Sequence, residues 1–150
     1  MYRNLRISVA LAAVLAVAAG CPMTTPTGAV NFSATLDGSQ EVPPVVTAAS
    51  GSGTLMLNES RTELSFSIIA SGLSGTVTGA HFHRGPMGED GPVVQDITSM
   101  VVESGGQVTL EGVWQVNEND VEELLDGNIY VNLHTAINPD GEIRATIQQN

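Results

Sequence analysis

The chain has 150 residues, enough for one domain, and its 42% hydrophobic content is that of a globular protein. Sixteen acidic residues against five basic ones give a net charge of -11. A surface of that sign repels phosphate backbones, so we exclude nucleic acid as a partner. The 16 glycines and 7 prolines, set among many valines and threonines, predict strands joined by tight turns.

Residues 1–20 have the pattern of a secretory signal peptide. Arg3 and Arg6 precede an apolar run from residue 7 to residue 20 that only Ser8 interrupts. At about 1.5 Å per residue this run spans about 21 Å, less than the roughly 30 Å of a membrane's hydrocarbon core. We therefore predict a cleaved export signal rather than a permanent transmembrane helix.

Cys21 is the only cysteine of the chain and ends the apolar run. Residues 18–21, Ala-Ala-Gly-Cys, resemble the lipobox of bacterial lipoproteins, in which the cysteine carries lipid. The resemblance implies an exported protein anchored in a membrane of the cell envelope through Cys21, with residues 21–29 as a flexible tether. Cleavage after residue 18 is the alternative, and it would give a soluble secreted protein.

Strand-like alternation begins directly after the tether, where every second residue from Val30 to Leu36 is apolar. Residues 48–53 are small and are predicted to form a loop, and the prolines at 43 and 44 exclude a central strand there. Seven or eight short strands separated by turn residues predict an all-β sandwich. The remaining strands are predicted at residues 54–57, 64–68, 76–83, 93–94, 108–116, 129–133 and 143–147.

One segment departs from the strand pattern, because residues 118–126 are predicted to form a short helix that closes one end of the sandwich. Asn117 or Asn119 can cap its N-terminus, and acidic residues occupy its first turn. The apolar face of this helix is expected to consist of Val121, Leu124 and Leu125.

Three segments resemble the CHRD domain, which is named after the repeats of chordin and occurs in exported bacterial proteins. They are residues 36–45 (LDGSQEVPPV), 81–93 (HFHRGPMGEDGPV) and 127–144 (GNIYVNLHTAINPDGEIR). Their order and spacing match that family over residues 30–148, so we predict a CHRD domain at residues 30–150. The resemblance implies an immunoglobulin-like, Greek-key β-sandwich, in agreement with the strand count, and it implies no settled activity for bacterial members.

The three histidines of the chain all fall inside these segments. Residues i and i+2 of a strand share a face, so His81 and His83 project together while Ala80 and Phe82 face the core. His134 lies on the non-core face of its own strand, and if the two strands are neighbours the three imidazoles converge. Neutral imidazoles suit Cu or Zn, so the three histidines are the candidate metal ligands. His134 shares its face with Tyr130 and Asn132.

Two other interpretations of the histidines stay open. Residues 81–83 (His-Phe-His) are similar, more distantly, to the copper segment of Cu/Zn superoxide dismutases, which implies a redox enzyme, although the chain lacks a bridging histidine and a disulfide. Alternatively, the histidines are structural, each donating from one ring nitrogen to a backbone carbonyl and so pinning a turn.

The acidic residues offer a weaker pattern. Arg144 shares a strand face with Glu142 and is expected to pair with a carboxylate rather than with a substrate. Four acids could supply oxygen ligands to Ca²⁺, but without the spacing of a known calcium loop. They are Glu89, Asp90, Asp140 and Glu142.

No nucleophile–base arrangement, phosphate-binding glycine loop or CxxC motif occurs, so we assign no catalytic residue. The first functional hypothesis is a non-enzymatic module of the cell envelope that binds a protein, a polysaccharide or a metal. The second is a copper-handling protein or copper-dependent redox enzyme that uses the three histidines.

Overall fold

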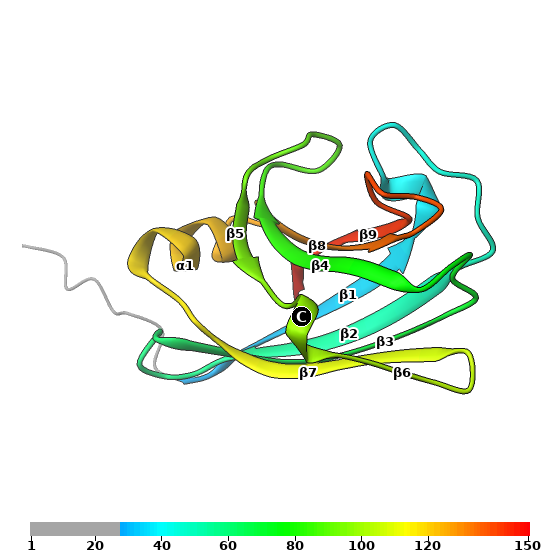
Figure 1. Ribbon diagram of the computed structural model, residues 1–150. Helices are drawn as coiled ribbons and strands as arrows, with labels where there is room; N and C mark the ends of the chain where they lie inside the picture. Colours follow the sequence, from blue (N-terminus) through cyan, green and yellow to red (C-terminus); the bar gives the residue numbers. More distant parts are fainter. Residues whose placement is uncertain (1–27) are drawn as a thin grey trace, which may run out of the picture.

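One curled antiparallel sheet folds over into two layers, as Figure 1 shows for the computed structural model. The structure describes residues 28–150, so the predicted signal peptide, Cys21 and most of the tether lie outside the described residues. The strands are β1 Val30–Asp37, β2 Ser50–Leu57, β3 Glu63–Ser71, β4 Val77–Arg84, β5 Val93–Asp96, β6 Val101–Ser104, β7 Gln107–Gln115, β8 Ile129–Thr135, β9 Ile143–Thr146 and β10 Gln148–Gln149. The helices are η1 Gly38–Gln40, η2 Thr98–Met100 and α1 Glu118–Leu125.

The strand order is β5-β4-β8-β9-β1-β2-β3-β7-β6, with β10 also paired to β1. Strand β1 joins the two layers, because it pairs with β2 on one side and with β9 and β10 on the other. The strands at the two ends of this order, β5 and β6, follow each other in the chain and are linked by η2. The predicted all-β sandwich with one short helix is confirmed.

The core lies between the two layers and is filled by the apolar side of the alternating strands. Phe82 is fully buried, with its ring edge-on to Phe66 at 5.2 Å and stacked on Trp114 at 5.3 Å between centroids. Val131, which the alternation places inward, is also fully buried. Further residues with no exposed surface include Phe32, Leu36, Leu57, Leu64, Ile68, Leu110, Ile129, Leu133 and Ile143.

The prediction of a loop at residues 48–53 is wrong in part, because β2 begins at Ser50. The glycines of this stretch lie where neighbouring strands approach closely. A Cβ atom on Gly53 would lie 2.9 Å from the Ile68 side chain, and one on Gly51 would lie 2.9 Å from the carbonyl oxygen of Ile69. The small residues therefore permit close packing in a strand rather than indicating a loop.

Helix α1 lies at one end of the sandwich (Figure 1), as predicted. Its N-cap is Asn117, whose side-chain oxygen accepts a hydrogen bond of 3.0 Å from the amide of Asp120. Asp120 in turn pairs with Arg84 at the end of β4, which ties the helix to the sheet. Leu125 is 40% exposed, so the predicted apolar face consists of Val121 and Leu124 alone.

Strand β8 is buried on both of its faces, which differs from an ordinary sandwich strand. Asn132 points away from the core, as the alternation predicts, but it is only 2% exposed, so the outer face of β8 is also covered at this position. Arg144, the cross-strand partner of Asn132 on β9, donates to the carboxylate of Glu41 and to the carbonyl of Glu89 and so fastens the segments around both residues to this face. Within residues 28–150, no helix is long and apolar enough to cross a membrane.

Candidate metal centre

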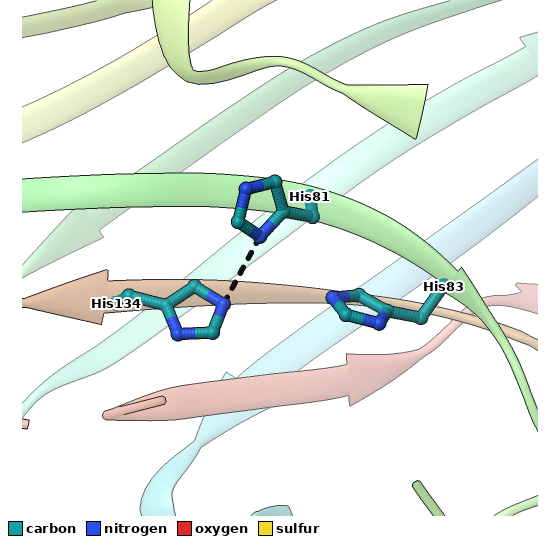
Figure 2. Close-up of side chains that lie close together, drawn as sticks. All are labelled: His81, His83 and His134. Atoms are coloured by element: carbon teal, nitrogen blue, oxygen red, sulfur yellow. Dashed lines mark hydrogen bonds between the residues drawn. The ribbon is translucent and has the colours of Figure 1, made fainter. Parts of the chain in front are cut away.

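The outer face of β4, β8 and β9 brings the three histidines together (Figure 2). His81 and His83 project from β4, and His134 projects from the adjacent β8, where Gly79 is its cross-strand partner. One potential ligand atom from each histidine lies within 4.8 Å of the other two. Alternation predicted that the histidines converge only if their two strands are neighbours, and the antiparallel pairing of β4 with β8 meets this condition.

Two of the histidines are oriented by backbone carbonyls. Nδ1 of His83 donates to the oxygen of Gly91 at 2.9 Å, and Nδ1 of His134 donates to the oxygen of Pro139 at 3.0 Å. In a neutral imidazole a proton on Nδ1 leaves a lone pair on Nε2, so both rings offer Nε2 as an acceptor or metal ligand. This part of the structural interpretation, in which the histidines pin turns, matches the observed hydrogen bonds.

Nε2 of His83 is buried and has no hydrogen-bond partner. Figure 2 shows one nitrogen of this ring facing the other two histidines, and His83 as a residue is 9% exposed. A buried polar atom left without a partner costs about 1–3 kcal/mol, and such atoms are rare in folded proteins. The turn-pinning role accounts for Nδ1 of His83 but not for Nε2.

His81 completes the group through a direct contact with His134. Because Nε2 of His134 carries a lone pair, Nδ1 of His81 donates to it at 3.1 Å. The other nitrogen of His81, Nε2, lies 4.0 Å from the carboxylate of Asp96. If the His81 proton moves to Nε2, it faces that carboxylate and Nδ1 becomes free to bind a metal, which is a common outer-sphere arrangement for metal-binding histidines.

Burial lowers the pKa of all three imidazoles below the ordinary value of 6.5. For His83 the repulsion from His134 and Arg144 lowers the pKa further, against the opposing effects of the Gly91 hydrogen bond and of the nearby Asn132 side chain. The three rings are therefore neutral near pH 7, the state in which imidazole binds a metal.

The separations set a condition on metal binding. Nitrogen ligands lie about 2 Å from Zn or Cu, so two of them on one ion are at most about 4 Å apart. The largest separation of 4.8 Å exceeds this limit, whereas the 3.1 Å between His81 and His134 is within it. Binding an ion therefore requires the rings to close by about 1 Å.

Two residues of this face went unassigned in the sequence, although the alternation placed them beside His134. Asn132 is the cross-strand partner of His81, and its side-chain amide lies 3.1 Å from Nε2 of His134. Because this nitrogen is an acceptor while Nδ1 donates to Pro139, the contact is a hydrogen bond when the amide NH2 group faces the ring. Tyr130 is the cross-strand partner of His83, and their rings stack at 4.8 Å with an interplanar angle of 7°. Their positions opposite the histidines follow from the register of β4 against β8, which the alternation along a single strand does not give.

Two of the four acidic residues considered as calcium ligands, Glu142 and Asp90, serve other contacts. The carboxylate of Glu142 is fully buried and accepts hydrogen bonds from Thr47, Ser74 and Thr135. Asp90 pairs with Arg144, whose Nε also donates to Glu41 at 3.1 Å. Arg144 therefore pairs with carboxylates, as predicted. Among residues 28–150, the three histidines are the group in which potential metal ligands converge.

The two layers and the partly buried histidines define the class, a β-sandwich domain with a polar centre on the outside of one layer. The chain belongs to the CHRD domain family, whose model matches residues 32–147. The predicted resemblance to this family is thus confirmed. No curated protein and no solved structure is significantly similar to the chain.

Proposed function

We propose that this CHRD domain is an exported, membrane-anchored binding module of the cell envelope, and that one of its ligands is a Cu or Zn ion at His81, His83 and His134. The observation that carries the metal is the buried Nε2 of His83, which has no partner and belongs to a ring whose Nδ1 is already fixed. A metal ion would satisfy this atom and would replace the short contact between His81 and His134.

Three neutral nitrogen ligands suit Cu and Zn better than Ca²⁺ or Mg²⁺, which prefer oxygen. Three protein ligands also leave a coordination position for water or an exogenous ligand, as in catalytic zinc sites. A copper-dependent redox activity would use the same three residues, so it requires no separate site and depends on the same metal-binding test. A protein or polysaccharide partner is compatible with the same module.

The metal proposal is tested on the purified protein with Cys21→Ser, so that the sole thiol does not bind metal. After incubation with Cu²⁺ or Zn²⁺ and dialysis, we expect one tightly bound ion per chain by elemental analysis. His83→Ala and His134→Ala should each weaken the affinity by about 100-fold or more, since outer-sphere changes alone cost about 10–100-fold. Thr109→Ala, on the outer face of the other layer, is the control. No stoichiometric metal, or unchanged affinity in both histidine variants, would refute the site.

The anchoring proposal depends on residues outside the described range. We expect the wild-type chain in the membrane fraction of a bacterial host, with a lipid-sized mass on its mature N-terminus, and Cys21→Ser in the soluble fraction. The same fractionation of Asn58→Ala, an exposed-turn change that keeps the cysteine, is the control. Equal partitioning of wild type and Cys21→Ser would count against the anchor.

A further inference from the structure

The orientation of His83 depends on a backbone segment that reaches over the sheet, residues 85–91 between β4 and β5. Within it, the carbonyl of Gly91 accepts the hydrogen bond of 2.9 Å from Nδ1 of His83. The amide of the same residue donates to the hydroxyl of Tyr130 at 3.1 Å. Because the Tyr130 ring also stacks on His83 at 4.8 Å, the three residues form a closed ring of contacts.

Glycine is the one residue type that fits at position 91. A Cβ atom there would lie 1.6 Å from the carbonyl oxygen of Arg84, so no side chain can be added while the backbone stays in place. The segment is therefore pressed against the end of β4, which carries His83. This close approach brings the Gly91 carbonyl within reach of the imidazole.

Arg144 fastens the same segment from the other side. Its guanidinium donates to the carbonyl of Glu89 at 3.2 Å and to the carboxylate of Asp90. The guanidinium carbon also lies 4.2 Å from the centre of the Tyr130 ring. Tyr130 is thus held between strands β4 and β9, in contact with both His83 and Arg144.

From this geometry we propose that Tyr130 is the positioning residue of the metal centre. Its hydroxyl accepts from the amide of Gly91, the residue whose carbonyl keeps the proton of His83 on Nδ1. Its ring keeps the imidazole plane fixed, so that Nε2 of His83 faces the other two ligands. The proposal rests on the metal site proposed above. The proposal also says which ring moves when the three histidines close on an ion. His83 is held in place and is the fixed ligand. His81, which no backbone carbonyl holds in the described structure, is the ligand that moves.

The test uses Tyr130→Phe, which keeps the ring stack and removes the hydroxyl alone. We expect the affinity for Zn²⁺ to fall by about 10–100-fold, the usual effect of an outer-sphere change, and the visible absorption of the Co²⁺-substituted protein to shift. Asn58→Ala is the control, because it removes a side-chain acceptor from two backbone amides, those of Thr62 at 2.9 Å and Glu63 at 3.2 Å, in the turn between β2 and β3. It should change neither readout, although both variants lose some stability.

A second readout does not depend on metal. In the metal-free protein, the ¹⁵N chemical shifts of His83 should show the Nδ1–H tautomer, and Tyr130→Phe should give a mixture of tautomers. If wild type binds no metal but the variant loses the tautomer preference, the metal proposal fails and the positioning role stands. If Tyr130→Phe keeps the tautomer, the Zn²⁺ affinity and the Co²⁺ spectrum of wild type, the positioning role is overturned.

Discussion

Glu41 is a buried carboxylate with few contacts that stabilise its charged form. It is 3% exposed, one of its oxygens accepts a hydrogen bond of 3.1 Å from Arg144, and the other oxygen is buried without a partner. Burial raises the pKa of Glu41 from 4.5 to about 7, because the attraction of Arg144 does not compensate for the lost hydration. A group whose pKa is raised on folding stabilises the fold below its unfolded pKa, and this stabilisation is lost as the pH rises through the folded pKa.

The perturbation is Glu41→Gln, which keeps the shape of the side chain and removes its titration. A rise of about 2.5 pKa units corresponds to about 3 kcal/mol, at about 1.4 kcal/mol per unit. The free energy of unfolding of the variant relative to wild type should therefore increase by about 3 kcal/mol between about pH 4 and about pH 8. The change should occur between pH 4.5 and about 7.

The assay is urea unfolding of both proteins across this range, without metal. The three histidines titrate in both proteins, so their effect cancels in the difference, which isolates Glu41. Glu111→Gln, at an exposed acid on the outer face of the other layer, is the matched control for the substitution itself. A flat difference for Glu41→Gln would refute the reasoning. A difference that turns against the variant as the pH rises would mean that Arg144 stabilises the charged carboxylate more than burial penalises it.

Three further predictions concern stability and pH. Glu142→Gln should destabilise the domain by about 3 kcal/mol in urea unfolding, because an amide group replaces an acceptor of the hydroxyl donors around it; Glu59→Gln, in an exposed turn, should cost almost nothing. Phe82→Ala should cost about 3–5 kcal/mol, since it removes the ring packed between Phe66 and Trp114; a loss below about 1 kcal/mol would contradict this packing. Because burial lowers the imidazole pKa values, Zn²⁺ affinity should begin to fall only below pH 6.5, and a metal titration that weakens already above that value would be inconsistent with these shifts.

Alternation along single strands was sufficient to predict much of the fold. The inward position of Phe82 and Val131 follows from period-2 patterning, which depends only on local geometry. The start of β2 was missed because glycine and serine have low strand propensity, while the close approach of Gly53 to Ile68 is a property of two paired strands, β2 and β3.

The candidate site divides in the same way. The shared face of His81 and His83 is a local property, whereas their meeting with His134 required the pairing of β4 with β8. The burial of Asn132 and Glu41 was beyond local reasoning, because it depends on contacts with residues distant in the chain: Asn132 lies opposite His81, and Glu41 bonds to Arg144. An alternating strand predicts which side faces the core, but it carries no information about what covers the other side.

The sheet order ends on two strands, β5 and β6, that are consecutive in the chain and four residues long each. Both the joining segment and β6 are bonded to β4, since Ile97 of the segment donates to the carbonyl of Ala80 at 2.9 Å and Glu103 of β6 accepts from the amide of Val77 at 2.8 Å. The two terminal strands of the sheet order are thus short, and they carry the exposed acids Asp96 and Glu103. Long, flat, uncharged edges recruit strands from neighbouring molecules. A chain concentrated on a membrane, as proposed here, would meet its own copies often, and this edge design disfavours aggregation between them.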